Sequence, residues 1–320
     1  MKKNPGSPAK AHTLSEVWKS EVQLRVQEYP YLQNQPLESL RLVHKRGGPL
    51  RIDKVGPVWV MGWWRDAEPS EKEIEEIKKF LKDQGCTRWY LHWRPRKSVS
   101  LKPRLLLESQ GGIPSPWEFL ENGICYEARK DQGDAFGLFF DQRSNRREIQ
   151  ESSQGKAVLN LFSFTCGFSV AAALGGAKRV VSVDLSRKYL DWGRVNFAKN
   201  DLAPESYEFF SMDTMESLKM AGRKSWLFDT IICDPPSFSR SKKGSFKIDR
   251  DYKELLQACW SVLEVGGTLW FSNNFEKWSA SVWQRNLQEC LPGAWSFKPL
   301  QKDFGGSDEQ TFQKTFIVKK

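Results

Sequence analysis

The amino-acid sequence predicts an α/β protein in which a small α+β domain precedes a doubly wound, mostly parallel sheet of about seven strands with an antiparallel last strand. Three observations lead to this prediction. From residue 157 onward, short apolar segments alternate with amphipathic ones, as strands alternate with helices in such sheets. The last two apolar segments, 295–300 and 311–318, are joined by a short link, which fits an antiparallel edge hairpin. Residues 40–130 lack the alternation, which favours a separate unit.

The first half predicts its elements from local signals. Two strands are joined by the turn Gly56-Pro57, and Ser70 caps an amphipathic helix that ends before Gly85. The strands are expected at 50–55, 58–64, 86–93 and 124–129, the helix at 71–83, and a Pro- and Gly-bearing connection at 102–116. The expected organisation is a tail and lead-in at 1–39, the small α+β domain at 40–130 and the larger domain at 131–320.

The second half predicts a series of strands and crossover helices. Its strands are expected at 158–162, 179–184, 207–213, 229–234 and 268–272, and its helices at 168–174, 186–200 and 252–263. Because parallel strands in one sheet end at the same edge, the polar residues that follow them should meet there. This edge is therefore the place to look for a ligand site.

Composition restricts the class of protein. The chain has 320 residues, 39% of them hydrophobic and 28% charged, and no apolar run approaches the roughly 18 residues of a membrane helix. Polar residues follow Met1-Lys2-Lys3 where a secretion signal would be apolar. The net charge of +10 fits either solubility or a polyanionic partner. The 14 Trp and 20 Phe either fill a core or stack on single-stranded nucleic acid.

The cysteines and histidines give no sign of a metal site or a disulfide framework. The six cysteines are at positions 86, 125, 166, 233, 259 and 290, and the three histidines are at 12, 44 and 92. The cysteines form no C-x-x-C pair, and no histidine lies near them at ligand spacing. We expect reduced thiols, no metal, no Ser-His-Asp triad and a cytoplasmic protein without a membrane segment.

The polar strand ends predict an adenosine site. The turn Ser163-Phe164-Thr165-Cys166-Gly167-Phe168 leads into a helix, but the chain has neither G-x-G-x-x-G nor G-K-[ST] to hold phosphates. Asp184 ends the second strand, where a carboxylate accepts from ribose hydroxyls, although it could simply cap the next helix. Asp213, beside Met212, offers an acceptor to an adenine amino group. An adenosine without phosphates fits these groups, and an ordinary strand-to-helix turn remains the alternative.

The fourth strand ends in the most specific local signal, Asp234-Pro235-Pro236-Ser237-Phe238. The two prolines fix an extended turn with free carbonyls, and Phe238 can stack on a planar base. The polar segment that follows would bind the flanking phosphates through Arg240, Lys242, Lys243, Lys247 and Arg250. A charged surface loop without a role is the alternative.

Five ordered segments resemble the RlmI and RlmK/L family of S-adenosylmethionine (SAM)-dependent large-subunit ribosomal RNA methyltransferases. They are residues 137–146, 159–168, 181–186, 234–238 and 271–274. The resemblance implies a Rossmann-like class I methyltransferase domain, for which an antiparallel last strand is typical, and SAM as the cofactor. Residues 43–64 resemble, more weakly, the small domain that precedes it, and no separate RNA-binding module of the RlmI branch is expected.

The resemblance also implies roles for single residues. Those expected at the cofactor are Phe140, Asp141, Arg143, Asn160, Phe162, Ser163, Thr165, Gly167, Asp184, Leu185, Ser186, Met212, Asp213 and Asp234. Those expected at the target base are Asp234, Pro235, Pro236 and Phe238. Contacts to RNA phosphates are expected from Arg94, Arg96, Lys97, Arg129 and Lys130 and from the basic residues between 240 and 250.

A departure from the family pattern favours one chemistry. The branch that makes 5-methylcytosine carries a nucleophilic cysteine where this chain has Asn273-Asn274. Cytosine C5 requires a thiolate, whereas a base nitrogen already has a lone pair and requires only alignment. Cys233 should point away from Asp234, and Cys166 should lie on the cofactor side. We therefore expect methylation of a base nitrogen, with guanine N7 favoured because Ser272-Asn273-Asn274 resembles the RlmK-type domain.

Three alternatives remain open at this point. The first keeps the fold but makes 5-methylcytosine, the second methylates a small molecule or a protein, and the third binds SAM or RNA without catalysis. The sequence determines neither the methylated nucleotide nor the oligomeric state. Nor does it decide whether free RNA or an assembling ribosomal particle is the substrate.

Overall fold

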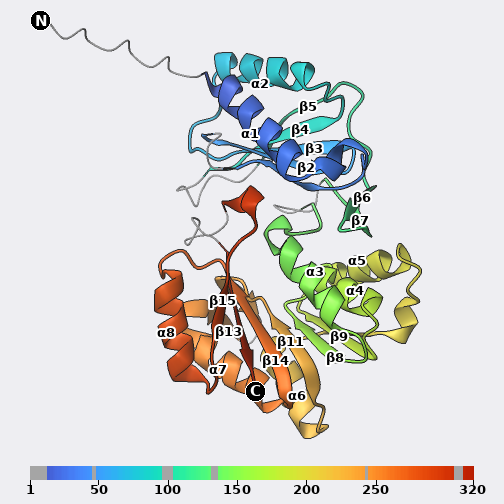
Figure 1. The fold of residues 1–320 in the computed structure, drawn as a ribbon, viewed down its shortest axis with the longest axis vertical. Coiled ribbons are helices and arrows are strands. Elements are labelled where there is room, and N and C mark those ends of the chain that lie inside the picture. Colours follow the sequence, from blue (N-terminus) through green and yellow to red (C-terminus); the bar gives the residue numbers. More distant parts are fainter. Residues whose placement is uncertain (1–12, 45–47, 96–103, 131–135, 242–243, 306–312) are drawn as a thin grey trace, which may run out of the picture. The chain divides into compact units, whose positions relative to one another are not determined.

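The computed structural model describes residues 13–44, 48–95, 104–130, 136–241, 244–305 and 313–320 (Figure 1). Its chain forms two compact units, Met1–Pro114 and Ser115–Lys320. This boundary differs from the expected one near residue 130, because the hairpin that follows Ser115 pairs internally and bonds to a helix of the second unit. The N–H of Glu127 in this hairpin donates to Oδ1 of Asn196 in that helix over 2.9 Å.

The first unit is a five-stranded sheet with two helices. The strands run in the order β1-β2-β3-β4-β5, in which β3 and β4 are parallel and the other neighbours antiparallel. They are β1 (Leu40–Val43), β2 (Leu50–Val55), β3 (Val58–Trp63), β4 (Trp89–Trp93) and β5 (Arg104–Glu108), and the helices are α1 (Leu14–Glu28) and α2 (Glu71–Asp83).

Helix α2 spans the residues that its local signals predict. Ser70 and Glu73 form a reciprocal capping box, and Ile77 and Phe80 are fully buried in the core of this unit. Helix α1 was not expected, since residues 1–39 were assigned to a tail and lead-in. Its Trp18 is fully buried and stacks edge-on against Phe80, with ring centroids 5.7 Å apart. Strand β5 likewise replaces part of the connection expected at 102–116.

The second unit contains the seven-stranded sheet, in the order β10-β9-β8-β11-β14-β16-β15. The first five strands in this order, β10, β9, β8, β11 and β14, are parallel to one another. Strand β16 is antiparallel to both of its neighbours, β14 and β15. The bounds are β8 (Ala157–Leu161), β9 (Arg179–Asp184), β10 (Glu208–Ser211), β11 (Phe228–Cys233), β14 (Leu263–Asn273), β15 (Ser296–Lys298) and β16 (Lys314–Lys319). The predicted doubly wound sheet with an antiparallel last strand is confirmed.

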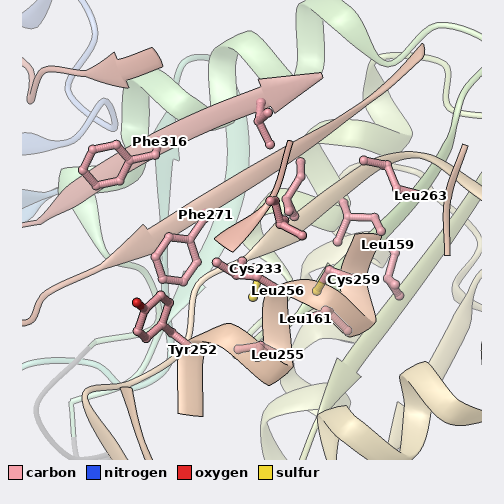
Figure 2. Close-up of a cluster of buried hydrophobic side chains, with 14 of the residues drawn as sticks. Leu159, Leu161, Cys233, Tyr252, Leu255, Leu256, Cys259, Leu263, Phe271 and Phe316 are labelled. Atoms are coloured by element: carbon pink, nitrogen blue, oxygen red, sulfur yellow. The ribbon is translucent and has the colours of Figure 1, made fainter. Parts of the chain in front are cut away.

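Helices cover both faces of this sheet. The helices of the second unit are α3 (Arg143–Ser152), α4 (Gly167–Leu174), α5 (Arg187–Ala198), α6 (Thr214–Arg223), α7 (Ile248–Ser261) and α8 (Ala280–Cys290). The main core lies between the sheet and helices α6 to α8, where Leu161, Leu255 and Phe271 are buried (Figure 2). Helices α4 and α5 pack on the other face, α3 beside α4. The sequence did not predict α3, α6 or α8.

Two small hairpins complete the second unit. The first consists of β6 (Trp117–Glu121) and β7 (Ile124–Ala128), and the second of β12 (Phe238–Ser241) and β13 (Gly244–Lys247). The second hairpin lies within the segment that was expected to be a polar loop, and Arg250 belongs to helix α7 rather than to that loop. In the part of the chain that the structure describes, no helix is long and apolar enough to cross a bilayer.

Candidate functional site

The turn after β8 has an unusual backbone. Phe162, Phe164 and Cys166 all have positive φ angles, of 56°, 48° and 63°, although none of them is glycine. Left-handed conformations of such residues are strained and persist where the surroundings fix them, often at ligand sites. Here the N–H of Cys166 donates to the carbonyl of Ser163 over 2.7 Å, and that of Ser163 donates to Val183 in β9 over 2.9 Å. The turn is thus a fixed platform at the carboxyl ends of β8 and β9.

The second half of this turn packs against strand β7 and the segment that precedes α3. The hydroxyl of Thr165 donates to the carbonyl of Gly137, and the Tyr126 hydroxyl donates to that of Gly167 over 3.2 Å. A Cβ on Gly167 would lie 2.5 Å from Cδ1 of Leu138. A side chain at position 167 would therefore require Leu138 to shift.

Asp184 links the turn to the next helix. Its two carboxylate oxygens accept from the N–H groups of Phe164 over 2.9 Å and Ser186 over 2.8 Å. Burial raises the pKa of Asp184, and these two hydrogen bonds oppose the rise. Each oxygen keeps a further lone pair that can accept from a hydroxyl group. The side chain of the next residue, Leu185, is 47% exposed, so an apolar surface adjoins the Asp184 acceptor.

Asp213 follows strand β10 and caps helix α6. Its Oδ1 accepts from the N–H groups of Met215 and Glu216 over 2.9 and 3.3 Å. The neighbouring side chains of Met212 and Met215 are partly buried and pack on the main core. The carboxylate thus combines with apolar walls, as an adenine pocket requires.

Asp234, at the end of β11, is held by two amide side chains. Nε2 of Gln142 donates to Oδ2 over 3.1 Å, and Nε2 of Gln313 donates to Oδ1 over 3.2 Å. Desolvation raises the pKa of Asp234 to about 7, and the negative charge of Asp141 contributes to the rise. Such a carboxyl group changes its charge near neutral pH, as groups at functional sites often do.

A hydrogen-bond network orients this carboxylate. Nδ2 of Asn145 donates to Oε1 of Gln142 over 2.5 Å and to Oγ1 of Thr315 over 3.0 Å. The hydroxyl of Thr315 in turn lies 2.9 Å from that of Ser272. Sequence reasoning missed Gln142 and Gln313, because neither adjoins Asp234 in the sequence and no local pattern marks them.

The end of β14 contributes a buried donor. Oδ1 of Asn273 accepts from the N–H of Phe275 over 3.2 Å, which determines the orientation of the amide. Nδ2 of Asn273 is buried and has no acceptor in the described part of the chain. The next residue, Asn274, accepts from the hydroxyl of Ser237 over 2.8 Å. The Asp234-Pro235-Pro236-Ser237 turn and the end of β14 thus form one structural unit.

Comparison with known proteins identifies the family. The family model described as "S-adenosylmethionine-dependent methyltransferase" matches residues 67–280. The chain belongs to this family. SAM is its cofactor.

Relatives and solved structures agree with this assignment. The chain is 48% identical over 195 residues to the ribosomal RNA large subunit methyltransferase K/L of Psychrobacter cryohalolentis, a match that covers 57% of this chain and 25% of the relative. It is 40% identical to the ribosomal RNA large subunit methyltransferase K of Neisseria meningitidis, with 52% and 48% covered. The chain thus spans between about a quarter and about half of the length of these relatives.

The crystal structure of the methyltransferase SMU.776, complexed with S-adenosylhomocysteine (SAH), resembles the whole chain. It is 27% identical, with a TM-score of 0.84, and the alignment covers 98% of this chain and 84% of that one. The small domain of this methyltransferase is therefore shared as well as its catalytic fold. The family model, the relatives and this structure all indicate a methyltransferase.

Several residues that were expected at the cofactor also have contacts that hold the fold of this methyltransferase together. Phe140 is buried among Phe119 and Phe136, with ring centroids 5.9 and 4.9 Å away. Arg143 forms a buried two-pronged ion pair with Asp303 over 2.8 and 2.9 Å. Both side chains belong to the packing that holds the segment before α3. Burial of Arg143 is possible because Asp303 supplies a matched carboxylate.

Two further residues of the cofactor set lie beneath the turn. Nδ2 of Asn160 donates to the hydroxyl of Ser169 over 2.9 Å, and the Asn160 side chain is buried. Thr165 is fully buried, as described above. The members of the cofactor set whose side chains are partly or fully accessible are Asp141, Phe162, Asp184, Leu185, Ser186, Met212, Asp213 and Asp234.

The basic residues divide into three groups. Arg94 is buried, with its guanidinium 5.5 Å from the ring centre of Trp64, and Arg250 is paired with Asp251 over 2.6 Å. The burial of Arg94 does not match the expected open phosphate contact, whereas the side chain of Arg250 is 58% exposed. Lys247 is exposed. Arg96, Lys97, Lys242 and Lys243 lie outside the described residues, and the side chain of Arg240 is not described.

The cysteines near the site are buried. Cys166 was expected on the cofactor side, but its Sγ packs where a Cβ on Gly193 of α5 would lie, 2.4 Å from it. Cys233 lies in the main core with Cys259 (Figure 2). Burial raises the pKa of the Cys166 thiol to about 12 and also raises that of Cys233. Among the described residues, no three metal-ligating side chains gather.

Proposed function

We propose that this methyltransferase modifies a base nitrogen of large-subunit ribosomal RNA in the cytoplasm, with guanine N7 as the favoured target. The observation that carries the proposal is the Asp234-Pro235-Pro236-Ser237-Phe238 turn, in which a carboxyl group with a pKa of about 7 adjoins an aromatic ring that is 47% exposed. The 40% identity to a ribosomal RNA large subunit methyltransferase K supports the RNA substrate.

The cofactor position that we propose follows the accessible side chains. Asp184 accepts from the ribose hydroxyls, Leu185 and Met212 contact the adenine ring, and Asp213 accepts from its amino group. The first N–H groups of α4 face the methionine carboxylate, since they have no partner within the helix. When bound, SAM supplies an electrophilic methyl group whose transfer leaves SAH.

The target site that we propose stabilises a cationic base. Methylation of guanine at N7 leaves a positive charge on the ring, and an ionised Asp234 beside the ring favours that charge. The buried amide donor of Asn273 suits a carbonyl acceptor such as guanine O6. Phe238 stacks on the base, and Pro235 and Pro236 keep the turn extended. No thiolate takes part in this chemistry.

RNA phosphates are assigned to the basic residues that the structure leaves available for this role. These are Lys247 and, on sequence grounds alone, Arg240, Lys242, Lys243, Arg96 and Lys97. Arg129 contributes less, because it pairs with Glu127 over 2.6 Å and stacks on Trp192. Lys130 stays in the set by its position in the sequence.

Mass spectrometry of ribosomal RNA tests the proposal. We expect large-subunit RNA from a strain without the gene to lack one 7-methylguanosine that returns when the parent gene is restored. The Asp234→Ala gene should not restore it. Loss of 5-methylcytosine instead would support the first alternative. Unchanged ribosomal RNA would contradict the RNA substrate and favour a small-molecule or protein substrate.

Cysteine replacement distinguishes nitrogen methylation from cytosine C5 methylation. We expect Cys166→Ser and Cys233→Ser to keep methyl transfer within about threefold of the parent, because both thiols are buried and neutral at pH 7. Cys125→Ser, on the separate β6–β7 hairpin, serves as the control for changes in folding. A covalent adduct with RNA containing 5-fluorocytosine, lost in one of these variants, would overturn the assignment.

A further inference from the structure

A cavity of the catalytic unit adjoins the expected adenine position. It has a volume of about 320 Å³ and lies between the start of α6, the β12–β13 hairpin and the first half of α7. Its lining includes Asp213, Met215, Ser239, Phe246 and Leu255. The carboxylate that we assigned to the adenine amino group is therefore part of a larger pocket. One wall of this pocket is the hairpin.

The hairpin has two different faces. Phe238 pairs with Lys247, and the next pair along is Ser239 with Phe246. Because successive side chains of a strand point to opposite faces, Phe238 and Phe246 lie on opposite sides of the hairpin. Phe238 follows the Asp234-Pro235-Pro236-Ser237 turn and is 47% exposed. Phe246 is partly buried and packs on the main core.

Phe246 also contacts the turn after β8. Its ring centroid lies 6.0 Å from that of Phe162, the first residue of that turn and one of those with positive φ. The hairpin thus rests on the strained backbone that borders the cofactor position. A ligand that contacts Phe162 therefore also restrains Phe246.

The hairpin is held at its base and along β13. Ser237 donates its hydroxyl to Asn274, and its carbonyl accepts from the N–H of Ile248 over 3.2 Å. Nη2 of Arg250 donates to the carbonyl of Ser245 over 2.7 Å. The two strands of the hairpin are joined by one hydrogen-bonded ladder, so the positions of Phe246 and Phe238 on its two faces are linked through the backbone.

We propose that Phe246 forms the wall of the adenine pocket and that the β12–β13 hairpin couples cofactor binding to RNA binding. The filled adenine pocket holds Phe246, and the opposite face then presents Phe238 and Lys247 to the target base and its phosphate. Because coupling is reciprocal, SAH strengthens RNA binding and RNA strengthens SAH binding by the same factor. The RNA part of this inference rests on the proposed function, whereas the adenine wall rests only on the cofactor.

Calorimetry with SAH tests the adenine wall. We expect Phe246→Ala to weaken SAH binding by about 10- to 100-fold, the usual effect of removing one stacked ring. Phe246→Leu keeps an apolar side chain, so its affinity for SAH should lie between that of the parent and that of Phe246→Ala. Phe238→Ala is the matched control on the other face and should bind SAH within about twofold of the parent. Parent-like SAH affinity of a folded Phe246→Ala protein would overturn the proposal.

RNA binding with and without SAH tests the coupling. The probe is an in vitro transcript of large-subunit ribosomal RNA. The parent should bind it more tightly in saturating SAH, Phe246→Ala should lose this gain, and Phe238→Ala should weaken binding in both conditions. Equal RNA affinity of the parent with and without SAH would refute the coupling. A parent that binds no RNA in either condition would refute the proposed function, while the SAH titration would still decide the adenine wall.

Discussion

An Asp234→Asn variant is expected to lose about 100-fold in the methyl-transfer rate, the usual effect of removing one group that stabilises transition-state charge. Its affinity for SAH should remain near that of the parent, since the assigned adenosine contacts lie at Asp184 and Asp213. Single-turnover assays with saturating SAM and calorimetry with SAH measure the two quantities. Full activity of the variant would exclude a role for this carboxylate.

The same carboxyl group predicts a pH dependence of the parent. The pKa of Asp234 is about 7, so the ionised form that stabilises a cationic base accumulates above this value. We expect the single-turnover rate to rise as the pH increases through about 7. Asp141→Asn should move the midpoint to lower pH, because the negative charge of Asp141 raises the pKa of Asp234. A rate that does not change between pH 5.5 and pH 8.5 would contradict this assignment.

Stability should change with pH in the opposite direction. The pKa of Asp234 is raised from 3.8 to about 7 on folding, so between these values the folded protein binds the extra proton. The stability linked to this proton is complete below pH 3.8 and is lost as the pH rises through about 7. The Asp234→Asn variant has no carboxyl group at this position, so its stability does not fall for this reason as the pH rises. Its melting temperature relative to the parent should therefore be higher at pH 8 than at pH 5.

Arg146→Ala is expected to lower the free energy of unfolding by about 3–5 kcal/mol, the cost of breaking a buried ion pair. Nε and Nη2 of Arg146 donate to the carboxylate of Glu121 in β6 over 2.6 and 2.7 Å, and the two side chains are 3% and 1% exposed. Nη2 also donates to the carbonyl of Phe139 over 2.7 Å. The replacement leaves the charge of Glu121 buried without its partner. Urea unfolding measures the change.

The neighbouring arginine provides the control. Arg147 pairs with Glu151, but the two side chains are 65% and 62% exposed. We expect Arg147→Ala to change the free energy of unfolding by less than about 0.5 kcal/mol. The double variant Glu121→Leu/Arg146→Met should be more stable than Arg146→Ala, because it buries no unpaired charge. Equal destabilisation by Arg146→Ala and Arg147→Ala would show that the buried pair has no special role.

Local sequence signals were sufficient for much of the fold. Residues 71–83 form the predicted helix because its cap and its apolar spacing involve near neighbours only. The alternation of apolar and amphipathic segments predicted the parallel sheet, and a parallel sheet brings Asp184, Asp213 and Asp234 to one edge. The polar strand ends therefore predict a candidate site at this edge. Helix α1 was missed because its buried residues stand among many charged ones.

The tertiary structure alone decided the environment of the charged residues. Arg143 and Arg146 resemble surface or ligand-binding residues in the sequence, yet each is buried against a carboxylate from a distant element. Gln142 and Gln313 are 92 and 79 residues away from Asp234 in the sequence, so no local pattern indicates that they bind it. The strand ends follow from periodicity along the chain, whereas the burial and charge of a side chain depend on partners that only folding brings together.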